Sequence, residues 1–199
     1  AAAATRPPIK VGTVRRLPPA VARDAGELEA LQQVTTYYHR KLLENPQALA
    51  YLTKRGLQHS EMIAHFRLGF SDRSLGLTLP EKNRQAGAAI REKLTALGVL
   101  SRETGHELLR GCITIPLLNE LGQPVGLYGR KISETLRQTS AKHLYLPGAH
   151  RGLLNPVALA ATDEIILCEA PLDALTFWCA GFRNVTTSYG VNGFGPIHR

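Results

Sequence analysis

Apolar residues recur every three or four positions over the first half of the chain, which is the spacing of helices that bury one side. The first such run begins at Glu27, and its apolar members are Leu28, Leu31, Val34, Tyr38 and Leu42. On a helix these positions fall on one face. The pattern therefore predicts a first helix with a single buried stripe.

Three shorter helices are predicted to follow the first. One spans Pro46 to Arg55, because proline suits the first helical turn and a glycine comes directly after the last residue. Another begins at Ser60, which we expect to cap it, and turns Ile63 and Phe66 inward. The last covers roughly residues 84–97 and also stops at a glycine.

The spacing changes from helix to strand after residue 110. Cys112–Leu118 and Val125–Tyr128 are apolar runs joined by N-E-L-G-Q, which predicts a β-hairpin with Gly122 in its turn. A brief further strand is predicted at His143–Leu146, within a segment punctuated by glycine and proline.

The end of the chain alternates between the two patterns, with a strand at Ile165–Cys168, a helix at Leu172–Ala180 and a strand at Val185–Ser188. This order is the start of a βαβ unit, so we expect the two strands to be parallel. Because Ile165–Cys168 is entirely apolar, we expect it to be covered on both faces.

Together these elements predict an α/β fold whose N-terminal part is α+β. The 199 residues, 44% hydrophobic and 20% charged, suffice for one ample core or two small ones. We expect a linker over residues 1–26, a unit of helices and a hairpin over 27–160, and the beginning of a second domain over 161–199.

Two carboxylates follow the apolar strand. Glu169 stands at its carboxyl end, where parallel sheets place ligand sites, and Asp173 comes four residues later in the first turn of the predicted helix. This spacing brings both to one side, so they could share a divalent cation. The structural alternative is that acidic residues in a first turn are stabilised by the helix dipole. Burial of Glu169 would favour the cation, because an unpaired buried carboxylate is costly.

Positive charge exceeds negative charge, with 24 Lys and Arg against 16 Asp and Glu and a net charge of +8. This balance favours a polyanionic partner such as nucleic acid. The excess gathers in residues 121–162, where Arg130, Lys131 and Lys142 are candidates for phosphate contacts. Tyr145 is a candidate for base stacking, although an aromatic residue between two leucines is more often part of a core.

Several classes of protein are disfavoured. Cys112, Cys168 and Cys179 show no C-x-x-C spacing, which argues against a zinc site in the chain and favours unpaired thiols in a reducing compartment. There is no P-loop motif and no G-x-S-x-G motif. No apolar run approaches the roughly 18 residues of a membrane span and no signal peptide is visible, so we expect no membrane partner and a cytoplasmic location.

Six short motifs occur along the chain in this order: Y-L-T-K-R-G-L (51–57), F-R-L-G-F (66–70), R-G-C-I-T-I-P (110–116), G-L-Y-G-R (126–130), K-H-L-Y-L-P (142–147) and E-A-P-L-D-A-L (169–175). Their order and spacing resemble the catalytic core of bacterial DnaG-type DNA primases. The last motif resembles the opening acidic motif of the TOPRIM fold. Its residues are more similar to those of the primase-like proteins of plasmids and other mobile elements than to those of a housekeeping primase.

The resemblance implies an enzyme that makes RNA primers on single-stranded DNA from nucleoside triphosphates, with Mg²⁺ or Mn²⁺ and with a replicative helicase as partner. Residues 27–160 would be the N-terminal subdomain of its RNA-polymerase domain, and 161–199 the first part of its TOPRIM domain. Glu169 would correspond to the TOPRIM glutamate and Asp173 to the aspartate of the same motif. The residues implied to hold template, primer strand and nucleotide are Arg110, Arg130 and Lys142.

The chain departs from the family pattern at several points. Ala170 stands where the acidic motif usually has glycine, and His143 and Tyr145 alter the usual K-Y-x-N. The D-x-D metal motif would lie beyond Arg199 and the zinc-binding domain before Ala1, so we expect a piece of a longer protein, inactive by itself. Two alternatives stay open: another TOPRIM enzyme of the nuclease or topoisomerase kind, and a non-catalytic module of a mobile element that binds single-stranded nucleic acid.

Overall fold

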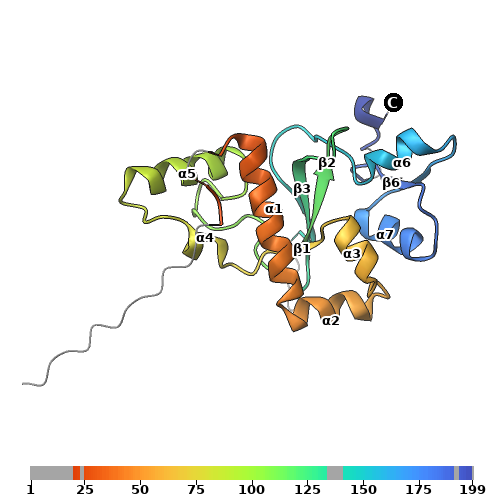
Figure 1. The fold of residues 1–199 in the computed structure, drawn as a ribbon, viewed down its shortest axis with the longest axis horizontal. Coiled ribbons are helices and arrows are strands. Elements are labelled where there is room, and N and C mark those ends of the chain that lie inside the picture. The colour runs from red at the N-terminus through yellow and green to blue at the C-terminus, as the bar shows by residue number, and fades with distance from the viewer. Residues whose placement is uncertain (1–19, 23–24, 134–140, 191–192, 199) are drawn as a thin grey trace, which may run out of the picture.

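The computed structural model of the chain describes residues 20–22, 25–133, 141–190 and 193–198. The helices are α1 (Glu27–Leu43), α2 (Pro46–Lys54), α3 (Ser60–His65), α4 (Leu75–Thr78), α5 (Gln85–Ala96), α6 (Pro156–Ala161) and α7 (Pro171–Cys179), with a 3-10 turn at Pro196–His198. The strands are β1 (Gly69–Phe70), β2 (Cys112–Leu118), β3 (Pro124–Lys131), β4 (His143–Tyr145), β5 (Ile166–Cys168) and β6 (Val185–Thr187). This mixture confirms the predicted α/β class. α4 and α5 lie at one end of the molecule and α6, α7 and β6 at the other, with α1 and the larger sheet between them (Figure 1).

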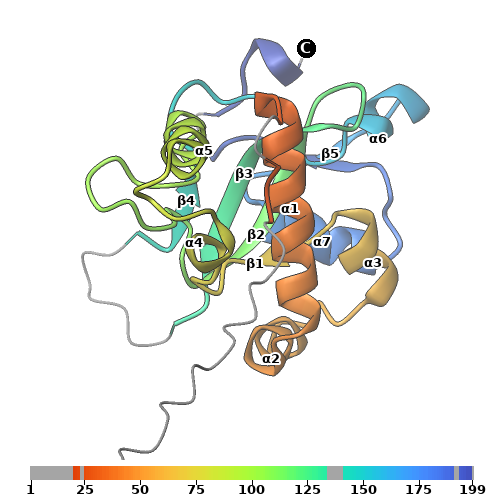
Figure 2. The ribbon, with the colours of Figure 1, turned by 60° about the vertical axis from the view of Figure 1, so that its left-hand side comes forward.

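The long helix α1 packs against the larger sheet, which it crosses in Figure 2. Most of its predicted stripe is buried, but Leu28 is 47% exposed, and that part of the prediction is wrong. The first turns face inward through Ala30, which lies two residues and therefore about 200° around the helix from Leu28. The helix comes so close to β1 that a Cβ added at Gly69 would lie 2.7 Å from the Cβ of Tyr38. Glycine at this position is what permits the contact.

The shorter helices confirm the predicted boundaries to within a residue or two. α2 begins at Pro46, where the side chain of Asn45 accepts the backbone N–H of Ala48 at 2.9 Å. The cap of α3 differs from the prediction. Nδ1 of His59, rather than Ser60, accepts the N–H of Met62 at 3.3 Å, because Ser60 is already the first helical residue. A capping side chain must stand one position earlier to reach that donor.

The larger sheet is antiparallel, with strand order β1-β2-β3-β4. The predicted hairpin of β2 and β3 is confirmed, and Gly122 in its turn has a φ of 70°. The register places Arg130 of β3 opposite Ile113 of β2 on one side and His143 of β4 on the other. Pairing in the sheet therefore brings two segments of the predicted basic region together.

The C-terminal unit is a parallel pair, β5 and β6, connected through α7, as predicted. The expectation that the first strand is covered on both faces is wrong, because Leu167 in the middle of β5 is 46% exposed. Within the described residues this sheet has two strands. The side chain of Leu167 faces outward, and no described helix or strand covers it.

Buried apolar side chains form two clusters. One joins α1, α4, α5 and the segment before β2, and it includes Val21 and Ala25, which lie near the end of the segment expected to be a linker. Residues 1–19 of that segment lie outside the described residues. The other cluster joins α2 and α3 to α7, β5 and β6, with the rings of Phe66 and Trp178 5.6 Å apart. The βαβ unit therefore packs directly on the N-terminal helices. In the described part of the chain, no helix is both long and apolar enough to cross a bilayer.

Candidate nucleic-acid and metal site

Arg130, near the end of β3, is held by side chains from two other elements. Its Nε donates a hydrogen bond to the hydroxyl of Tyr51 on α2 at 3.3 Å, and its Nη1 donates to Nε2 of His143 on β4. The guanidinium of Arg55 lies 5.0 Å from the centre of the Tyr51 ring. Three segments therefore converge on the first of the predicted phosphate-binding residues.

The hydrogen bonds of His143 define its protonation. A guanidinium can only donate, so Nε2 of His143 accepts from Arg130 and carries no proton. Nδ1 then holds the proton and donates it to the hydroxyl of Tyr128 at 2.8 Å. Burial, and then the charge of Arg130, lower the pKa of His143, which agrees with a neutral ring. Burial also raises the pKa of Tyr128, so its hydroxyl stays protonated.

The two predicted carboxylates stand at the end of β5 and in the first turn of α7. Glu169 follows the strand directly, and its backbone C=O accepts the N–H of Gly190 from the loop after β6 at 3.3 Å. Asp173 lies one turn into α7, whose first helical residue is Pro171. Both side chains are exposed, and neither makes a hydrogen bond or ion pair with the described residues. The argument for a cation from burial of Glu169 therefore fails, because water can solvate this carboxylate.

The basic and acidic groups lie near one another. The charges of Asp173 and Glu169 both act to raise the pKa of His143, against the larger effects of burial and Arg130. The charge of Asp173 also acts to raise the pKa of Tyr128 and that of Cys168, in both cases as a smaller effect than burial. Tyr145 of β4 also packs on Tyr189, whose neighbour Gly190 binds the C=O of Glu169. The fold therefore brings the β3–β4 edge to the carboxylates that follow β5, although Arg130 and Glu169 are about 40 residues apart along the chain.

The other residues predicted beside Arg130 lie along the same edge. The backbone N–H of Lys131 donates to the C=O of Lys142 at 3.1 Å, so these lysines are neighbours across the β3–β4 pair. The ring of Tyr145 is partly buried and contacts those of Tyr128 and Tyr189, at 5.2 and 5.5 Å between centroids. Tyr145 thus packs against the core, the less specific of the two roles considered for it. Whether these residues contact nucleic acid stays a prediction.

Arg110 is not part of this group. It is exposed in the turn before β2 and lines a separate cavity of about 470 Å³, together with Arg73 and His106. A metal site is also not assembled from side chains in the described part of the chain, where no three His, Cys, Asp or Glu residues are grouped to hold an ion. The three cysteines are unpaired, as predicted.

Sequence reasoning did not single out Tyr51, Arg55 or His143 as site residues. Tyr51 and Arg55 belong to a motif that was noted, but nothing in their spacing indicates a contact with a strand some 80 residues later. His143 differs from the family pattern, and that difference was the available signal. Its ring forms hydrogen bonds with both Arg130 and Tyr128. The sequence does not show that these two residues lie close enough for a histidine to join them.

The sequence of this chain is similar to that of known proteins. Residues 37–148, more than half of the chain, match the family model "DNA primase catalytic core, N-terminal domain". A DNA primase of Helicobacter pylori is 30% identical over 181 residues, which cover 84% of this chain and 30% of that protein. The chain thus spans less than a third of the length of such curated relatives.

Solved structures have the same fold. A DNA primase domain from Pseudomonas aeruginosa superposes with a TM-score of 0.70 at 23% identity, over 87% of this chain and 56% of that one. A DnaG primase catalytic domain bound to single-stranded DNA superposes with a TM-score of 0.66 at 22% identity, over 86% of this chain and 56% of the other. At these identities the superpositions establish the fold alone.

Proposed function

This chain belongs to the bacterial DnaG-type DNA primase family, and from that premise we propose that it forms part of an enzyme that synthesises RNA primers on single-stranded DNA. Because the chain spans only about a third or less of the length of its curated relatives, the activity belongs to the whole protein. Residues 27–160 would supply the N-terminal subdomain of the polymerase, and 161–199 the first part of the TOPRIM domain. A replicative helicase is the expected partner of the whole protein.

The observation that supports the proposal is the meeting of opposite charges at the β3–β4 edge. Arg130 binds His143 of this edge, and the ring of Tyr145 on the same edge lies 5.5 Å from that of Tyr189. Gly190, the next residue, donates its N–H to the C=O of Glu169, and the charges of Asp173 and Glu169 act to raise the pKa of His143. Transfer of a nucleotide needs this combination, because phosphates must be held by cations while carboxylates hold the metal ions that neutralise charge in the transition state.

The carboxylates suit a divalent cation. Magnesium binds through one or two carboxylates and completes its coordination with water and substrate phosphates. Glu169 and Asp173 are exposed, and neither carboxylate makes a hydrogen bond or an ion pair with a described residue. They would hold Mg²⁺ or Mn²⁺ together with a nucleotide's phosphates, and the ion would stabilise the charge that develops on those phosphates.

The cations of the chain would position the strands. Arg130, oriented by Tyr51 and His143, presents a planar donor group that suits phosphate oxygens. Lys131 and Lys142 extend the positive charge along the edge as point charges. His143, kept neutral, would keep the Nη1 group of Arg130 engaged and so limit the orientations of the guanidinium.

The test is metal-dependent primer synthesis by the full-length protein on single-stranded DNA. Glu169→Gln should reduce synthesis by about 100-fold or more, because the amide keeps the shape but loses the charge that binds the cation. Glu164→Gln is the matched control, since Glu164 is also exposed, precedes the same strand, and has contacts through its backbone C=O. Equal activity of Glu169→Gln and wild type would refute the assignment.

A non-catalytic module that binds single strands is the second candidate. It is favoured by the departure from the family's K-Y-x-N motif, where His143 and Tyr145 replace the usual residues. Strand binding by the full-length protein without any primer synthesis in Mg²⁺ or Mn²⁺ would select this function over the first.

A further inference from the structure

The short loop between β1 and α4 presents an arginine where two cavities meet. Arg73 lines a cavity of about 810 Å³, together with Tyr51 and Lys54 of α2. It also lines the cavity of about 470 Å³ that contains Arg110 and His106. The two cavities thus share Arg73 as a common wall. Cations line both of them, together with Asp72 in the larger cavity and Glu107 in the smaller one.

The backbone of Arg73 is held in a conformation that its side chain disfavours. Its φ is 72°, in the left-handed region, where a residue with a Cβ is strained. Such strain persists only where the surrounding structure enforces it, and it is concentrated at functional sites. The conformation therefore calls for an explanation in terms of what the arginine does.

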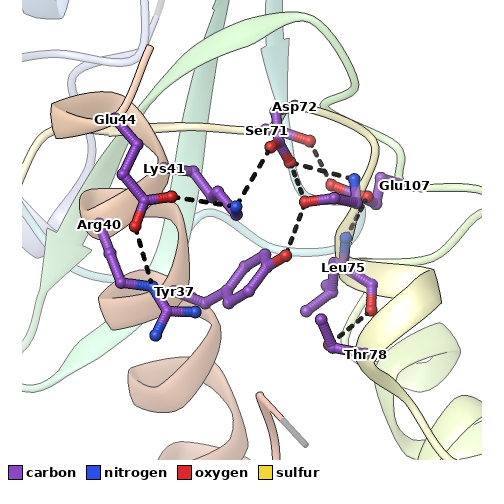
Figure 3. Close-up of polar contacts among 10 residues, drawn as sticks. Tyr37, Arg40, Lys41, Glu44, Ser71, Asp72, Leu75, Thr78 and Glu107 are labelled. Carbon is purple, nitrogen blue, oxygen red and sulfur yellow. Dashed lines mark hydrogen bonds and ion pairs between the residues drawn. The ribbon is translucent and has the colours of Figure 1, made fainter. Parts of the chain in front are cut away.

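A buried network enforces the shape of this loop (Figure 3). Glu107, 4% exposed, accepts the hydroxyl of Ser71 at 2.5 Å and the backbone N–H of Leu75 at 3.0 Å, and so grips the loop on both sides of Arg73. Asp72 accepts the backbone N–H of Ser74 at 3.0 Å. The backbone of Ser71 is tied in turn to that of Gly111, whose N–H donates to its C=O at 2.7 Å.

The charges around the loop leave its arginine available. Asp72 accepts a hydrogen bond from the Ser74 N–H and lies 3.8 Å from the ammonium of Lys41, so its side chain is directed to these partners and not to Arg73. Both oxygens of Glu107 are occupied within the network. The guanidinium groups of Arg73 and Arg110 make no ion pair with any described residue, and both side chains are exposed. Two cations thus face solvent across one cavity.

We propose that Arg73 binds the phosphodiester backbone of a single nucleic-acid strand that runs along these two cavities. This inference rests on the proposed function and extends it. Cations line successive cavities instead of converging on one point, which suits a strand better than an isolated phosphate. Tyr51 forms part of the wall of the larger cavity and also binds Arg130. The track is therefore continuous with the candidate site.

Because Arg73 has a left-handed backbone conformation, replacing it with glycine removes the positive charge and also relieves backbone strain. Glycine adopts a φ of 72° without strain, so Arg73→Gly should fold at least as well as wild type. Arg67 is the matched control, because it has a φ of 47° and its guanidinium binds the C=O of Gly122 in the hairpin turn, at neither cavity. Arg67→Gly removes the same charge from elsewhere.

The experiment is fluorescence anisotropy of a labelled DNA strand of roughly 16 nucleotides with the full-length protein, across a salt series. Arg73→Gly should raise the Kd about fivefold at low salt and lower the slope of log Kd against log salt by about 0.7, the loss of one phosphate contact. Arg73→Lys should keep most of the slope, and Arg67→Gly should match wild type. An RNA strand of the same sequence shows whether the contact serves a DNA template or either nucleic acid.

Four outcomes overturn the inference. Binding by Arg73→Gly with the wild-type Kd and slope would show that Arg73 touches no phosphate. Equal losses in Arg73→Gly and Arg67→Gly would show an effect of net charge alone. If Arg130→Gln weakens binding and Arg73→Gly does not, this inference fails while the proposed function stands. If wild type binds no strand at all, both fail.

Discussion

The hydroxyl of Tyr51 on α2 accepts a hydrogen bond from Nε of Arg130 on β3 at 3.3 Å, although 79 residues separate them in the sequence. The guanidinium of Arg55 lies over the ring of the same tyrosine at 5.0 Å. Tyr51 thus stands between two arginines and restrains the one at the candidate site.

Tyr51→Phe tests this restraint. The substitution removes the hydroxyl but keeps the ring beneath Arg55, so we expect the free energy of unfolding to fall by about 1 kcal/mol or less. The affinity for a single strand should fall by roughly threefold, because Arg130 loses one of its two side-chain partners. Thermal unfolding and anisotropy measure the two effects. An affinity equal to that of wild type would show that Arg130 does not need the tyrosine.

The pKa of His143 predicts a dependence of stability on pH. Burial and Arg130 lower this pKa from its ordinary value of 6.5, so over the range between the folded and unfolded values the unfolded state binds more protons. The stability that this residue contributes is present above pH 6.5 and falls as the pH drops below it. Urea unfolding between about pH 5 and pH 7.5 should show a shallower dependence in His143→Gln than in wild type. The control is His106→Gln, and a slope unchanged in His143→Gln would contradict the prediction.

Glu107 should contribute strongly to stability through the loop it grips. Glu107→Gln replaces one acceptor oxygen with a donor that faces either the Ser71 hydroxyl or the Leu75 N–H, so we expect a loss of about 1–3 kcal/mol. Chemical denaturation measures it. Glu103→Gln, at an exposed position in the same turn region, should change stability by less than about 0.5 kcal/mol. A Glu107→Gln variant as stable as wild type would show that the network does not hold the loop.

Trp178 should hold the βαβ unit against the N-terminal helices. Its ring lies 5.4 Å from that of His65 and 5.5 Å from that of His59, both at α3, with the guanidinium of Arg183 3.3 Å from its centre. Trp178→Ala should cost about 3–5 kcal/mol by denaturation. Phe177→Ala, on the same helix but 41% exposed, should cost about 1 kcal/mol or less. Similar losses in the two variants would mean that α7 does not depend on this contact.

Local patterns predicted most of the secondary structure because each depends on neighbours in sequence. The helix at Pro46, the hairpin around Gly122 and the parallel pair in the C-terminal unit follow from residue type and spacing. The failures at Leu28 and Leu167 have one cause. An apolar side chain is buried only if another element covers it, and spacing along one segment does not contain that information.

The sequence by itself determined the family, through the order of its motifs, and it predicted a candidate site at Glu169, Asp173 and the basic edge. Only the tertiary structure decided which of these residues meet. It joined Arg130 to Tyr51 and His143, separated Arg110 from them, and left Glu169 exposed. The reason is physical: strand register and helix packing set distances between segments far apart in the chain, and side-chain chemistry acts only over those distances.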